Sequence, residues 1–159
     1  MKKNLIILTA MLFIILTAKG QNLFLIGEHS YPCTEIITFQ ANSDDKSELN
    51  VLFAKDGTAG VFGISTEFFM YAIFSEKLII YLKDGIVITC DNRGVTEYVD
   101  HHAKAVYYLT NEQLNKMKNS DIHTVRYTLE NNSIDVEWNF SASSLGVSTK
   151  NIITKFFKD

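Results

Sequence analysis

The stretch LNVLFAKDGTAGVFGIS at residues 49–65 decides the class of fold. Two runs of apolar, β-branched and aromatic residues, which are enriched in strands, lie on either side of Lys-Asp-Gly. Asp-Gly readily adopts the positive φ angles of a tight type I′ turn. The stretch therefore predicts a β-hairpin with its turn at Asp56-Gly57.

Two more segments predict hairpins of the same kind. KLIIYLKDGIVITC at residues 77–90 repeats Lys-Asp-Gly and predicts a turn at Asp84-Gly85. TVRYTLENNSIDVEWNF at residues 124–140 predicts a turn at Asn131-Asn132, because asparagine tolerates the left-handed region. Apolar residues alternate with polar ones in this third segment, which indicates strands with one face on a core and the other in water.

The remaining β structure is expected earlier in the chain and inside the second hairpin. Residues 36–41 predict a strand, preceded by an extended lead-in at residues 21–35 that contains the only proline. Residues 78–82 are apolar on both faces, which is typical of a central strand that is covered on both sides.

A short connector helix is predicted at residues 109–120, LTNEQLNKMKNS. Thr110 or Asn111 can cap its first turn, because both residue types accept hydrogen bonds from exposed helix N–H groups. Leu114 and Met117 fall on one side of such a helix and are expected to face the core.

A second helix is predicted at the C-terminal segment STKNIITKFFKD, residues 148–159, with Ser148 as its cap. Its amphipathic pattern predicts that one side docks on the sheet, and a membrane-surface or partner-helix role is the alternative. The apolar stripe consists of Ile152, Ile153, Phe156 and Phe157.

The order of these elements determines the expected architecture. Several hairpins precede a helix, another hairpin and a final helix, without the alternating pattern that produces parallel sheets. We therefore predict an α+β fold with a mainly antiparallel sheet built from hairpins. A β-sandwich with a peripheral helix is the alternative.

The first twenty residues, MKKNLIILTAMLFIILTAKG, have the features of a secretory signal peptide. Two lysines precede a short apolar run, and small residues precede the expected cut between Gly20 and Gln21. We predict an exported bacterial protein, periplasmic or secreted, whose mature chain is a single domain at residues 21–159 with no stable membrane insertion after signal cleavage.

The expected mature chain is acidic. The full sequence has 15 basic and 18 acidic residues, and the leader removes three lysines and no acidic residue, which leaves 12 against 18. Nucleic acids and anionic membranes require clustered positive charge. The dispersed, acidic composition therefore argues against both as partners.

Cys33 and Cys90 are the only cysteines. An even pair in an exported chain predicts a disulfide, which would contribute on the order of 4 kcal/mol by closing a loop of this length. Two separate, buried, unpaired thiols are the alternative. Neither cysteine has a neighbouring base that would indicate a nucleophile.

The stretch EYVDHHAKAVYY at residues 97–108 places Asp100 before two histidines, a combination that raises the question of a metal site. Adjacent residues of a strand point to opposite faces, so His102 pairs better with Asp100 than His101 does. Asp91 and His123 are further candidate ligands, with His29 and Glu97 also available, although no regular spacing organises them. We interpret the stretch as the hydrated start of a strand, with a metal site as the alternative.

No other motif in the chain indicates catalysis or a cofactor. A nucleophile elbow and a phosphate-binding loop are both absent from the sequence. We therefore expect a non-catalytic binding module at the cell envelope that takes a protein, peptide or glycan and carries no cofactor. The alternative is a small metal-dependent or acid–base hydrolase that uses Asp100 and His102.

Overall fold

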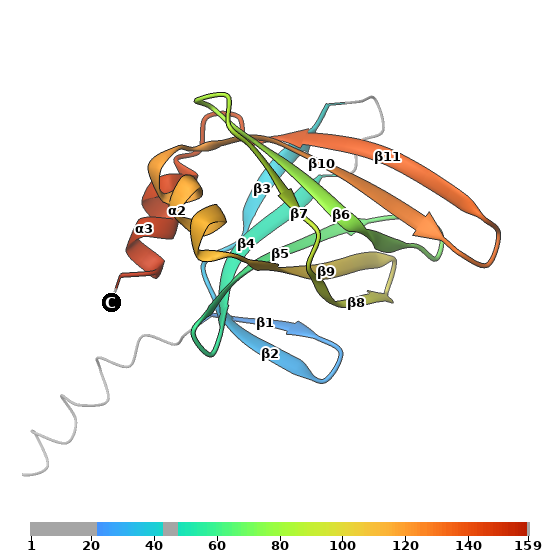
Figure 1. The fold of residues 1–159 in the computed structure, drawn as a ribbon. Helices are drawn as coiled ribbons and strands as arrows, with labels where there is room; N and C mark the ends of the chain where they lie inside the picture. Colours follow the sequence, from blue (N-terminus) through green and yellow to red (C-terminus); the bar gives the residue numbers. More distant parts are fainter. Residues whose placement is uncertain (1–21, 43–47, 159) are drawn as a thin grey trace, which may run out of the picture.

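The hairpins form an antiparallel sheet that curls into a nearly closed barrel (Figure 1). The computed structural model describes residues 22–42 and 48–158, so the predicted signal peptide lies outside the described residues. The described strands are β1 (Asn22–Ile26), β2 (His29–Cys33), β3 (Ile37–Ala41), β4 (Leu49–Asp56), β5 (Ala59–Glu67), β6 (Ile73–Leu82), β7 (Val87–Cys90), β8 (Arg93–Val99), β9 (His102–Leu109), β10 (Ile122–Asn131) and β11 (Val136–Ser143). The described helices are α2 (Asn111–Asn119) and α3 (Thr149–Phe156).

The strands follow one another around the barrel in the order β7-β6-β10-β11-β3-β4-β5-β9-β8. Every strand pair in the described residues is antiparallel, which confirms the predicted hairpin-built antiparallel sheet. The β1–β2 hairpin leaves this path, and in the described residues its one ladder pair with the path is Cys33 opposite Ala54. It packs over the outside of the barrel and forms a local second layer there (Figure 1).

All three predicted hairpins are present, but their turns differ from the predictions. The first turn comprises Gly57 and Thr58, because Asp56 pairs with Ala59. Gly57 has a φ of 58° in the first turn position, as a type II′ turn requires and glycine permits. The second connection is a longer loop in which the Leu82 N–H donates to the carbonyl of Ile86.

The third turn lies further along the chain than predicted. Asn131 is the last residue of β10, and the positive φ, 53°, belongs to Asp135. The Asn131 side chain donates to the carbonyl of Tyr71 and accepts from the Ser133 N–H, at 2.8 and 3.0 Å. The asparagine therefore organises the loop through its side chain and does not occupy a left-handed turn position.

Two further hairpins were not predicted. The supposed lead-in forms β1 and β2, with a turn at Gly27-Glu28 between the paired Ile26 and His29. Asp100 and His101 form the turn between β8 and β9, with φ angles of 50° and 62°. Positive φ at both central residues is the pattern of a type I′ turn.

Side chains close the seam of the barrel between β6 and the β8–β9 hairpin. The Tyr107 hydroxyl donates to the carbonyl of Ser75 at 2.6 Å, and the Arg93 guanidinium donates to the carbonyl of Phe74. Arg93 also lies 3.5 Å from a carboxylate oxygen of Glu130. The bonds from Tyr107 and Arg93 give the carbonyls of Ser75 and Phe74 a donor where β6 and β9 form no ladder. The Tyr107 ring is buried in the core between these two strands.

The connector helix α2 confirms the prediction for residues 109–120. Thr110 is its N-cap and accepts from the Gln113 N–H, while the Gln113 side chain accepts from the Thr110 N–H in a capping box. Leu114 and Met117 are buried, as predicted.

The cap of α3 differs from the prediction. Ser148 occupies the N-cap position, but its side chain makes no bond to a helix N–H. Asp121, which precedes β10, accepts from the Lys150 N–H at 3.0 Å and from the Ser148 hydroxyl at 3.2 Å. Thr149 in turn accepts from the Ile122 N–H at 2.8 Å. The helix is therefore fastened to the start of β10.

The two helices pack against each other at one end of the barrel (Figure 1). Ile153 of α3 is buried, whereas Ile152, Phe156 and Phe157 are half-buried against the core. Neither helix in the described part of the chain is long and apolar enough to cross a membrane.

Candidate functional site

The predicted metal ligands Asp100 and His102 lie at the tip of the β8–β9 hairpin. Both side chains are exposed. The His102 Nδ1 atom lies 2.8 Å from the backbone oxygen of Asp100, so this contact involves the peptide group and not the carboxylate. Asp100 and His101 form an exposed hairpin turn, and His102 is the first residue of β9.

The other two candidate ligands, Asp91 and His123, lie elsewhere in the fold. Asp91 lies in the link between β7 and β8, and His123 lies near the start of β10, just after α2. His102 begins β9 at the barrel end remote from the helices, roughly 20 Å from the end where β9 meets α2. Among the described residues, no three His, Cys, Asp or Glu side chains come together as metal ligands.

The predicted disulfide between Cys33 and Cys90 is absent, and both residues are buried free thiols. Cys33 lies in the small cluster beneath the β1–β2 hairpin, whereas Cys90 lies in the main core. The prediction was wrong because a sheet separates the two residues. Burial raises the pKa of Cys33, and burial together with the charge of Asp91 raises the pKa of Cys90 to about 12.

A groove beside α3 is the largest hollow that we describe, with a volume of about 810 Å³. It lies between α3, the loop before it and the link from β2 into β3. Ligand pockets in proteins commonly enclose 300–1,000 Å³ and have mainly apolar walls. We call it the α3 groove, and its lining residues are Thr34, Glu35, Ile36, Ile37, Thr38, Lys55, Val147, Ile152, Lys155 and Phe156.

The α3 groove combines apolar side chains with positive charge. Ile36 is 62% exposed and Val147 is 36% exposed, and both line the groove. The Lys55 ammonium lies 5.2 Å from the centre of the Phe156 ring, and Lys155 lines the groove from α3. Large exposed aliphatic side chains beside ammonium groups can hold a ligand that has an apolar body and a carboxylate.

One edge of β3 opens into the α3 groove. The Asn42 N–H donates to the carbonyl of Ser141, so even-numbered residues of β3 direct their backbone groups towards β11. In the described residues, β11 pairs with β3 only at Gln40 and Ala41. The backbone N–H and C=O of Thr38 therefore face the position that a continued β11 would occupy.

The chain leaves that position because of two left-handed residues after β11. Residue 145 would lie opposite Thr38 if the register of β11 continued. Leu145 and Gly146 instead have φ angles of 47° and 90°, which turn the chain away towards α3. Glycine adopts such an angle without strain, whereas leucine rarely does. The turn leaves room beside Thr38 for an extended segment.

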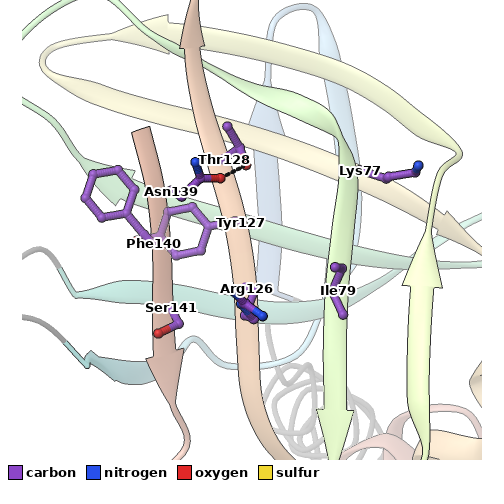
Figure 2. A pocket seen from close by; sticks show the side chains of 8 residues that line it. All are labelled: Lys77, Ile79, Arg126, Tyr127, Thr128, Asn139, Phe140 and Ser141. Carbon is purple, nitrogen blue, oxygen red and sulfur yellow. Dashed lines mark hydrogen bonds between the residues drawn. The ribbon is translucent and has the colours of Figure 1, made fainter. Parts of the chain in front are cut away.

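A second hollow of about 410 Å³ lies on the outer face of β6, β10 and β11 (Figure 2). We call it the outer-face hollow. Arg126 and Thr128 project from the middle strand, β10, between Ile79 on one side and Asn139 on the other (Figure 2). Its lining residues are Lys77, Ile79, Arg126, Tyr127, Thr128, Asn139, Phe140 and Ser141.

No protein-family model, curated protein or solved structure matches this chain. Neither hollow was identified from the sequence, since the lining of the α3 groove comes from four separate segments. The signals that were available are the apolar stripe of residues 148–159 and the water-facing residues of the third hairpin.

Proposed function

We propose that this protein is an exported, non-catalytic binding module that holds an extended peptide in the α3 groove. The observation that carries the proposal is the unpaired β3 edge at Thr38, which lies among apolar side chains. Extended peptides commonly bind by adding a strand to such an edge. Backbone hydrogen bonds then provide affinity, and pockets for the side chains provide specificity.

The charges of the groove favour a peptide with a carboxylate. Lys55 and Lys155 both line it, against a single carboxylate from Glu35. The Lys55 ammonium lies over the Phe156 ring, which holds it near the apolar wall. The described lining contains no imidazole or thiol that would serve as a base or nucleophile, which favours binding over catalysis.

Export remains part of the proposal and rests on the leader at residues 1–20. A groove that binds peptides in the periplasm or outside the cell would meet unfolded segments and protein tails. The experiment below needs only purified protein and tests binding separately from export.

A linear peptide library displayed on phage, selected on the purified protein, tests the proposal. We expect selected peptides to combine apolar residues with at least one acidic residue. Ile36→Asp should abolish their binding, because it places a negative charge in the apolar part of the groove. Ile36 is 62% exposed, so this change should leave folding intact.

Thr38→Pro tests the backbone contact separately. Proline lacks the N–H that would bond to the peptide, and it is tolerated on a free strand edge. The expected loss of affinity is about 2- to 10-fold, the value of one hydrogen bond. Lys77→Ala on the outer face is the control and should leave peptide binding unchanged. Recovery of no peptide, or of peptides that bind both groove variants as well as the original protein, would refute the proposal.

A further inference from the structure

We propose that the outer-face hollow is a second binding site and that it takes an acidic saccharide. This site goes beyond the proposed peptide groove and does not depend on it. The hollow lies over three hydrogen-bonded strands, whose register fixes two rows of side chains across the sheet. One row joins Ile79, Arg126 and Ser141, and the next includes Thr128 and Asn139 (Figure 2).

Neighbouring contacts fix which groups of the hollow face a ligand. The Thr128 hydroxyl donates to the Asn139 side-chain oxygen at 2.7 Å, and within the described residues the NH₂ group of Asn139 has no acceptor, so it can donate to a ligand. The Ser141 hydroxyl accepts from the Asn42 amide at 3.2 Å, which leaves its own proton available. The hollow thus presents an amide and a hydroxyl donor on adjacent rows of one strand.

Arg126 supplies the charge of the site. One of its guanidinium nitrogens donates to the Tyr81 hydroxyl at 3.3 Å, which leaves its other N–H groups for a ligand. Within the described residues, neither Arg126 nor Lys77 has a carboxylate within ion-pair distance. Glu130, which lies two residues beyond Thr128 on β10, is paired with Arg93.

The chemistry of these groups indicates the class of ligand. A guanidinium on a rigid strand suits a carboxylate or sulfate group, with which it forms two parallel hydrogen bonds. The amide and hydroxyls of Asn139, Ser141 and Thr128 both donate and accept, as the hydroxyl groups of a sugar do. Ile79 offers an apolar surface for the C–H face of a sugar ring. An acidic saccharide combines all three features.

Titration calorimetry with the trimer of galacturonic acid tests the proposal, with maltotriose as the neutral saccharide and inorganic sulfate as the simple anion. We expect the acidic trimer to bind, and to bind more tightly than either of the other two probes. Arg126→Ala should weaken binding tenfold or more, the value of a charged hydrogen bond. Arg126→Lys should recover part of this loss, because it keeps the charge and loses the paired geometry.

Two controls connect the result to this face of the protein. Arg126 is exposed, so its replacement should leave the unfolding midpoint unchanged. Lys155→Ala, in the α3 groove, should leave saccharide binding unchanged. Failure of the trimer to bind at millimolar concentration would overturn the proposal. Equal binding of maltotriose or sulfate, or full binding by Arg126→Ala, would also overturn it.

Discussion

Asp121→Ala should destabilise the protein, because Asp121 binds the start of helix α3. The same helix forms one wall of the α3 groove. The Asp121 carboxylate accepts from the Lys150 N–H and the Ser148 hydroxyl at the start of α3, and one of its oxygens lies 3.9 Å from Lys83 Nζ. Ser148 makes no cap bond of its own, so Asp121 provides the side-chain cap of this helix end within the described residues. The change therefore removes the only side-chain cap described for α3.

The magnitude follows from three interactions. Loss of a helix N-cap costs about 0.5–2 kcal/mol, and loss of a negative charge at a helix start costs about 0.3–1 kcal/mol. The pair with Lys83 adds little, because Lys83 is 41% exposed and such pairs contribute about 0.2–1 kcal/mol. We expect a decrease of about 1–3 kcal/mol in the free energy of unfolding, or roughly 3–4 °C in melting temperature for each kcal/mol.

Urea unfolding measures this free energy, and native-state hydrogen exchange locates the loss. Asp121→Asn is the matched variant: it keeps an oxygen acceptor and removes the charge, so it should lose less than Asp121→Ala. The exchange of α3 amides should increase in both variants. A loss below about 0.5 kcal/mol for Asp121→Ala, which is typical of an uninvolved surface residue, would refute this role of Asp121.

Three further predictions concern the core. Tyr107→Phe should cost about 1–3 kcal/mol in urea unfolding, because the carbonyl of Ser75 loses its donor at the seam; an unchanged midpoint would contradict this. Burial raises the pKa of Cys90 and of Tyr127 to about 12, above their ordinary values of 9.0 and 10.0, so their contribution to stability is complete below pH 9 and is lost between pH 9 and 12. The free energy of unfolding should therefore be lower at pH 10.5 than at pH 8, and the decrease should be smaller in Tyr127→Phe. A higher value at pH 10.5 would contradict the assignment. Mass analysis after alkylation of the unfolded, unreduced protein should find both Cys33 and Cys90 alkylated, because both are free thiols. If both cysteines stay unalkylated, the disulfide is present after all.

The predicted hairpins show how far local sequence determines this fold. The runs beside Lys-Asp-Gly identified β4–β5 and β6–β7 because alternation and turn residues are local signals. The β8–β9 hairpin was missed because its turn uses Asp100 and His101, and histidine seldom marks a type I′ turn. The β1–β2 hairpin was missed because a short apolar patch with Pro32 suggested an extended lead-in and not two paired strands.

Closure of the barrel depends on contacts that no local pattern contains. Arg93 and Tyr107 reach backbone groups of β6 across the seam, and their partners are identified only once the strand order is known. The free edge at Thr38 likewise depends on where the chain turns away after β11, at Leu145 and Gly146.

The sequence predicted some properties of the sites but not the sites themselves. The alternation of the third hairpin predicts one face in water, and Arg126 and Thr128 lie on that face. The apolar stripe of residues 148–159 predicts a surface that docks on the sheet, whereas in the structure Ile152 and Phe156 also line the α3 groove. Neither pattern identifies the residues that lie opposite, because these come from distant segments.

The proposed peptide groove is tested most directly by the amide resonance of Thr38. In a ¹⁵N-labelled sample titrated with the tightest selected peptide, we predict that the Thr38 amide shifts downfield and becomes protected from solvent exchange at saturation. The resonances of Ile36 and Ile152 should shift with it. If the peptide leaves the Thr38 amide unchanged while shifts gather around Arg126 and Ser141 on the outer face, the α3 groove is not the peptide site.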